Sequence, residues 1–350
     1  MKTKALIKSL IFLILTISFL ILLILFPSVS KNSVTDGILL CGRVIIPSLF
    51  PFMICLSLVI NSNILENFSF ISPLTKRIFS LDFFEFSIFV FSLVGGYPIG
   101  AKLLSESVKT GKISREKASK MLNFCINAGP AFIVSVAGVS ILKSTTAGYI
   151  LLFSHLLSSL IICLLNREKT PENKPPKAKK ETTFSLADSF VLSVADSSAA
   201  MMKMCSFVLF FCSVNGFFIY FSSAFPPLQK AALFLEITTA LSLSKNLYLI
   251  AFLLGFGGIS IWCQVLSLSE NLKIKLPVFI GFRTLHGALS SLFTYLLVKI
   301  FKITLPTLSS PPVADLYSNH AVALSLLIMG IIFLMSLSCK KDKNLFKELI

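Results

Sequence analysis

Apolar segments of membrane-spanning length recur along this chain, and they restrict its fold more than any other feature. One runs from Ser9 to Phe26, and further ones occupy 121–142, 146–165, 189–224, 277–302 and 319–338. A helix of about 20 such residues crosses the hydrocarbon core of a bilayer. Because a spanning segment must satisfy its own backbone polar groups in lipid, these lengths favour helices. The sequence therefore predicts an all-α polytopic membrane protein.

Charge agrees with this fold class. Charged residues make up 14% of the 350 residues, whereas a soluble domain has about 25%. Lys and Arg outnumber Asp and Glu by 32 to 16, but the basic residues gather between apolar segments, as in 109–120. This pattern is typical of cytoplasmic loops and indicates a lipid partner rather than nucleic acid. The eight cysteines include no CxxC pair, so we expect neither a disulfide framework nor a metal, and no cofactor.

Two apolar segments are interrupted by a glycine pair. Each pair has a polar residue seven positions after its first glycine: Gly95, Gly96 and Lys102 in the first segment, and Gly257, Gly258 and Gln264 in the second. Glycine lets the backbone leave a helix, and the freed polar groups must then face protein or a water-filled cavity. Two such breaks predict re-entrant or broken helices around a transporter's binding site. Kinked helices in a packed bundle are the alternative.

A charged, proline-rich stretch at 166–187 divides the chain, and we expect it to be a flexible cytoplasmic linker. It separates two weakly repeated halves, 36–165 and 188–303, in which an Asp precedes the Gly-Gly pair by a similar spacing. The remaining ranges predict an N-terminal anchor at 1–35 and a last span with its tail at 304–350. Between Asp36 and Ile60, Arg43, Pro47 and Pro51 predict a bent or interfacial helix.

The predicted topology contains a conflict. An inverted repeat with every apolar segment crossing once would place the basic C-terminal tail outside, against the positive-inside pattern. We therefore expect one segment, 228–243, to cross differently from the others.

Two polar positions in apolar surroundings are candidate solute contacts. Asn127 and Gly129, in CINAGPAF, stand at the start of an apolar helix, where free N–H groups attract anions. An ordinary helix start is an equal alternative. Glu236 is the only acid in its apolar run. A charge at the bilayer centre costs roughly 2.5–3.5 kcal/mol, so Glu236 could take a proton, bind a coupling cation or pair with a cation.

Arg283 and His286 lie about one turn apart on one helix face. Arginine suits bidentate carboxylate binding, and snorkelling to the interface is the competing interpretation. We expect Arg43 and Lys203 to snorkel and His155 to be a packed histidine. No GxSxG, HExxH or paired-carboxylate arrangement is present, so the sequence does not favour an enzyme.

These segments resemble the YlbJ family of sporulation integral membrane proteins, which carry a Gate (nucleoside-recognition-like) domain. The resemblance rests on Pro47 to Phe52, Gly95 to Lys102, Asn127 to Phe132, Leu235 to Thr239, Gly257 to Gln264 and Arg283 to Gly287. It implies a bacterial membrane protein of the mother-cell or outer forespore membrane that transports a small anionic solute, dipicolinate being the candidate. The alternatives are transport of a nucleoside-like solute and a role as a membrane scaffold for spore envelope assembly.

Overall fold

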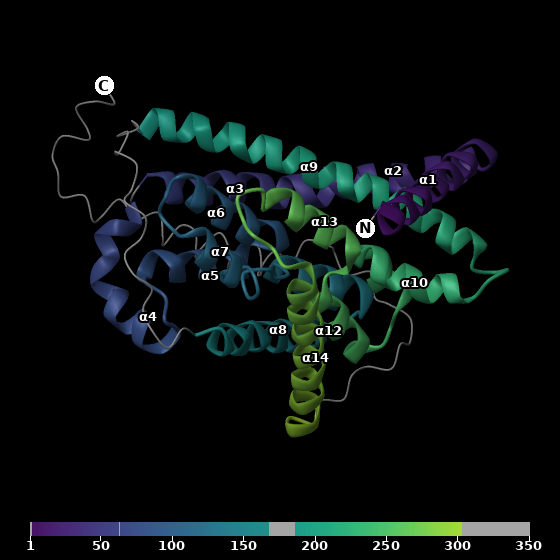
Figure 1. The fold of residues 1–350 in the computed structure, drawn as a ribbon. Coiled ribbons are helices and arrows are strands. Elements are labelled where there is room, and N and C mark those ends of the chain that lie inside the picture. Colours follow the sequence, from purple (N-terminus) through teal and green to yellow (C-terminus); the bar gives the residue numbers. More distant parts are fainter. Residues whose placement is uncertain (1, 63, 168–185, 303–350) are drawn as a thin grey trace.

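The structure is a computed structural model that describes residues 2–62, 64–167 and 186–302, and in these ranges it is a helical assembly (Figure 1). Six helices in the described part are long and apolar enough to cross a membrane, and a bent pair of helices makes a seventh candidate. The all-α, polytopic prediction is confirmed. Most of the predicted linker, the predicted span 319–338 and the basic tail lie outside the described residues.

Two long helical segments lie side by side. The first is built from α2 (Pro27–Leu40), a π-helical turn (Cys41–Ile45) and α3 (Ile46–Asn61), and the second is α9 (Leu186–Phe221). They are antiparallel, because Ser30 bonds Ser213 at 2.8 Å while Asn61 bonds Ser193 at 3.3 Å. α1 (Lys2–Leu25) precedes them. The π turn contains Arg43, so the predicted bend is a local widening of one helix.

The first diglycine lies between two helices that fold back on one another. A short helix (Ile64–Ile71) and α4 (Ser72–Phe79) lead into α5 (Phe83–Gly95) and α6 (Tyr97–Lys109). Asp82 and Glu85 form a capping box that starts α5. A Cβ added to Gly100 of α6 would lie 2.9 Å from the Cβ of Ser92 of α5. α5 and α6 therefore form a hairpin.

The predicted span 121–142 is an interrupted helix. α7 (Arg115–Met121) ends early, residues 122–129 are irregular, and a π-helix follows at Phe132–Ile141 before α8 (Thr145–Leu165). A proline at 130 removes a backbone donor, and Gly129 packs against Gly96. The irregular stretch is thus placed by a tertiary contact that the apolar pattern does not reveal.

The apolar segment 228–243 does not form one continuous helix. Two short helices, α10 (Pro227–Leu235) and α11 (Ile237–Leu243), meet at an extended Glu236 and pack together. With a rise of 1.5 Å per residue, helices of nine and seven residues reach only about 14 and 10 Å, too short to cross about 30 Å of hydrocarbon. How this segment crosses the membrane stays a prediction.

The second diglycine lies inside a candidate span, between α12 (Leu247–Phe256) and α13 (Gly258–Leu268), and α14 (Leu276–Ile300) follows. The loop before α14 meets the basic segment 109–120, since Lys273 N–H donates to Ser119 at 2.9 Å. The Lys273 ammonium also lies 3.5 Å from Glu116. These two basic stretches therefore lie on the same side of the molecule.

Candidate functional site

Both glycine pairs break their helices, as predicted. Gly96 has φ 92° and ψ 174°, a conformation that is essentially restricted to glycine. Gly257 has φ 86° and Gly258 has φ 78°. Neither region is a continuous helix, because a residue at positive φ ends the regular hydrogen-bond pattern.

The two broken regions lie close together. The Tyr97 hydroxyl, one residue after the first break, donates to the carbonyl of Leu254 at 2.7 Å. A Cβ on Gly257 would lie 3.7 Å from the Tyr97 ring, in ordinary contact. Tyr97 is buried, so it joins the α5–α6 hairpin to the α12–α13 span inside the protein.

Each glycine break is also packed against a second interruption. A Cβ on Gly96 would lie 3.6 Å from the nitrogen of Gly129, in the irregular stretch after α7. A Cβ on Gly258 would lie 3.3 Å from the carbonyl oxygen of Phe234, where α10 ends. Four interruptions thus meet in one region, which we call the crossing: Gly96, residues 122–129, Glu236 and Gly257–Gly258. The sequence pattern pairs the two glycine breaks with each other, and the structure adds a different neighbour to each.

Asn127 lies fully buried in the irregular stretch. Its side-chain nitrogen donates to Ser92 at 3.1 Å and to the carbonyl of Phe124 at 2.9 Å, but its side-chain oxygen has no partner. An unsatisfied buried acceptor requires an explanation, such as a water or a ligand that fills the site. The Asn127 side-chain oxygen is therefore free to accept one more hydrogen bond.

Arg283 does not snorkel to the interface. It is 1% exposed, and its two terminal nitrogens donate to the carbonyls of Ile126 and Asn123, each at 2.6 Å. Its Nε has no partner. Among the described residues no carboxylate forms an ion pair with Arg283, so a full positive charge sits at the crossing, partly solvated by two carbonyl dipoles.

The rings of His155 and His286 lie against one another, with centroids 4.4 Å apart and an angle of 31° between their planes. The Nε2 of His155 accepts the N–H of Ala128 at 3.0 Å, and the Nε2 of His286 lies 3.3 Å from the carbonyl of His155. Both Nδ1 atoms are buried without a partner. If both rings are neutral, these bonds leave His155 with a free Nδ1–H donor and His286 with a free Nδ1 acceptor.

Glu236 is buried, and one of its carboxylate oxygens caps the start of α11. That oxygen accepts from Thr239 N–H at 2.8 Å, from the Thr239 hydroxyl at 3.1 Å and from the Thr238 hydroxyl. Within the described residues the carboxylate forms no ion pair. Of the three roles that the sequence left open, pairing with a cation is thus not seen, and a proton or coupling cation stays a prediction.

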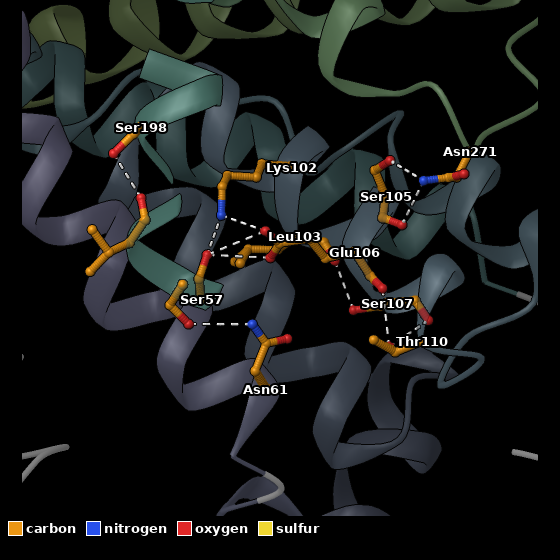
Figure 2. A network of polar contacts seen from close by, with 12 residues as sticks. Ser57, Asn61, Lys102, Leu103, Ser105, Glu106, Ser107, Thr110, Ser198 and Asn271 are labelled. Atoms are coloured by element: carbon orange, nitrogen blue, oxygen red, sulfur yellow. Dashed lines mark hydrogen bonds and ion pairs between the residues drawn. The ribbon is translucent and has the colours of Figure 1, made fainter. Parts of the chain in front are cut away.

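Lys102 and Gln264 lie away from the crossing along their helices. Lys102 is six residues beyond Gly96, about 9 Å along α6, and it pairs with Glu106 and Ser57 (Figure 2). Gln264 is buried and donates to Ser260 at 3.3 Å. The structure therefore brings Gly96, Asn127, Gly129, Glu236, Gly257, Gly258, Arg283 and His286 together, and it leaves Lys102 and Gln264 in separate contacts.

Three residues of these contacts were missed or undervalued by sequence reasoning. Tyr97 follows the first glycine pair directly, so its position next to the break was a usable signal. His155 lies alone in an apolar segment, and nothing in that segment predicts that its ring accepts a hydrogen bond from Ala128. Glu106 stands four residues after Lys102, which is the spacing of a helical ion pair and could have predicted their contact.

Comparison with known proteins agrees with the helical, membrane-embedded geometry. The curated sporulation integral membrane protein YlbJ of Bacillus subtilis (strain 168) is 24% identical to the chain over 320 residues, which covers 78% of each sequence. This similarity supports the resemblance to the YlbJ family of sporulation integral membrane proteins. No protein-family model matches the chain, and no solved structure matches it. Its Gate-like character and an inverted relation between its halves stay predictions.

Proposed function

We propose that this protein transports a small anionic solute, dipicolinate being the candidate, across a membrane of the sporulating cell. The location that we propose is the mother-cell or outer forespore membrane. The solute passes unchanged, so the proposal is not an enzymatic one. The observation that carries it is the unpaired charge of Arg283, buried at a place where four helix interruptions meet.

Two physical arguments support transport at the crossing. Interrupted helices expose backbone polar groups at membrane depth, and these are tolerated where they line a solute path. The side chains around residues 123–128 also leave polar atoms unsatisfied, namely Asn127 Oδ1, His155 Nδ1, His286 Nδ1 and Arg283 Nε. A planar dicarboxylate offers acceptors for the donors in this set, and Arg283 supplies the opposite charge. These polar groups are buried by the surrounding helices, as expected for a transporter in a closed conformation.

The test is uptake into proteoliposomes of three solutes of different charge. We expect dipicolinate to enter, and the neutral diamide of the same ring and the nucleoside uridine to be excluded. Lys102→Ala should reduce uptake, while Lys203→Ala, which removes an exposed cation of α9, serves as the matched control. Arg283→Ala removes two backbone contacts, so its uptake is to be normalised to the folded protein recovered.

Other outcomes would favour the other functions. Uptake of uridine alone would favour the nucleoside-like solute suggested by the Gate resemblance. Absence of uptake for every solute, with unchanged behaviour of the Lys102 and Arg283 variants in sporulating cells, would favour a scaffold in spore envelope assembly. In that case substitutions in the loop 109–120 and in the linker 166–187 should have the larger effect.

A further inference from the structure

Lys102 and Glu106 form a buried ion pair on α6, between the crossing and the basic segment 109–120. The Lys102 ammonium lies 2.5 Å from a Glu106 oxygen and also bonds the Ser57 hydroxyl of α3. Ser57 lies 3.3 Å from the other Glu106 oxygen. The two side chains are 5% and 12% exposed. Figure 2 shows Lys102 directed at Ser57 and Glu106, so its charge is already occupied by an anion that belongs to the chain.

Few other charges act on this pair. α3 and α13, which both pack against α6, contain no Asp, Glu, Lys or Arg, and their titratable groups are the thiols of Cys55 and Cys263. From α9, the half-buried Asp196 acts electrostatically on Glu106. On α5, Glu85 is itself paired with Lys117 of α7 at 2.8 Å. Lys102 is therefore the cation that balances Glu106, and Asp196 adds negative charge nearby.

This arrangement sets a condition on any anion that reaches Lys102. The ammonium has three donors, two of which Ser57 and Glu106 already use, so an anion that binds Lys102 competes with the Glu106 carboxylate for its charge. A carboxylate left alone in a buried site carries a large desolvation cost, so it takes up a proton instead. The nearby Asp196 charge acts in the same direction, since like charges oppose ionisation.

We propose that Lys102 and Glu106 form a proton-coupled exchange site on the solute's path. A carboxylate of the solute replaces the Glu106 carboxylate on Lys102, and Glu106 accepts one proton from water on the same side. When the solute leaves, Glu106 releases that proton and re-forms the pair with Lys102. This inference rests on the proposed function and adds to it that one proton moves with each solute molecule.

The experiment measures accumulation of radiolabelled dipicolinate in proteoliposomes with the membrane potential clamped by potassium and valinomycin. With one proton per solute, a gradient of one pH unit, acidic outside, should raise accumulation about tenfold. A pH-sensitive dye should report one proton entering per dipicolinate. Uptake that ignores the gradient and moves no protons would overturn this inference alone, whereas absence of dipicolinate uptake would overturn the proposed function as well.

Variants assign the proton to Glu106. Glu106→Gln keeps a hydrogen-bonding side chain but cannot be a carboxylate, so the uptake that remains should show no response to the gradient. Glu270→Gln, which removes the acid of the exposed Lys203–Glu270 pair, is the matched control and should keep the wild-type response. A Glu106→Gln protein with the wild-type response would overturn the assignment. If that variant does not fold, the dye measurement on the wild-type protein still decides the proton coupling.

Discussion

The irregular stretch at 122–129 and the glycine break at 257–258 belong to the same crossing, but they are held in different ways. The first is held by residues far away in the sequence. Two of its carbonyls accept hydrogen bonds from Arg283, and its Ala128 N–H donates to His155. The second is satisfied locally. Gly257 N–H donates to Leu253 at 2.8 Å, and the Trp262 indole donates to Phe256 at 2.8 Å.

This difference shows which of the two breaks depends on hydrogen bonds from other helices. Local hydrogen bonds within one span let the 257–258 break form with that span. In the 122–129 stretch, the Ala128 N–H needs α8, and the carbonyls of Asn123 and Ile126 need α14, before they have partners.

The largest expected effect comes from Arg283→Met. Two charge-assisted hydrogen bonds are lost, and the carbonyls of Asn123 and Ile126 stay buried, so we expect the free energy of unfolding to fall by roughly 3–6 kcal/mol. Thermal unfolding in detergent measures the loss. Hydrogen exchange should speed up at 122–129 and not at 256–258. Equal acceleration in both regions would remove the distinction between them.

An intermediate effect is expected from Gly96→Ala. The observed φ and ψ at Gly96 are strained for any residue with a Cβ, at a cost of about 1–3 kcal/mol. The control is Gly281→Ala in the regular part of α14, where nothing lies within 4 Å of an added Cβ. That substitution should raise the free energy of unfolding by about 1 kcal/mol. A neutral Gly96→Ala would mean that the hairpin relaxes without its left-handed residue.

The smallest effect should follow Trp262→Phe. The ring remains apolar and packed near Phe256 and Phe279, while the indole hydrogen bond to the Phe256 carbonyl is lost. One neutral hydrogen bond is worth about 1 kcal/mol of unfolding free energy. Exchange should increase only near the second break. Acceleration at 122–129 after this substitution would show that the two interruptions are coupled more tightly than their contacts indicate.

Sequence reasoning found the fold class, both glycine breaks and most of the residues at the crossing. It did not find that Glu236 joins two short helices, because an apolar run of sixteen residues reads the same whether or not it crosses the bilayer. It also assigned Lys102 to the solute, since the contact with Glu106 was not considered. Arg283 was expected to face a carboxylate or the interface, and carbonyls of a distant loop have no signature in its own segment.

The sequence by itself determined that this chain lies in a membrane as helices, and that two of these helices break at glycine pairs. Hydropathy and backbone freedom are properties of a short segment, so they can be read from that segment alone. Tertiary structure alone decided which interruptions meet, because Gly96 packs on Gly129, and Gly258 on the end of α10. Packing of that kind depends on which helices pass one another, and residues far apart in the chain carry no local mark of it.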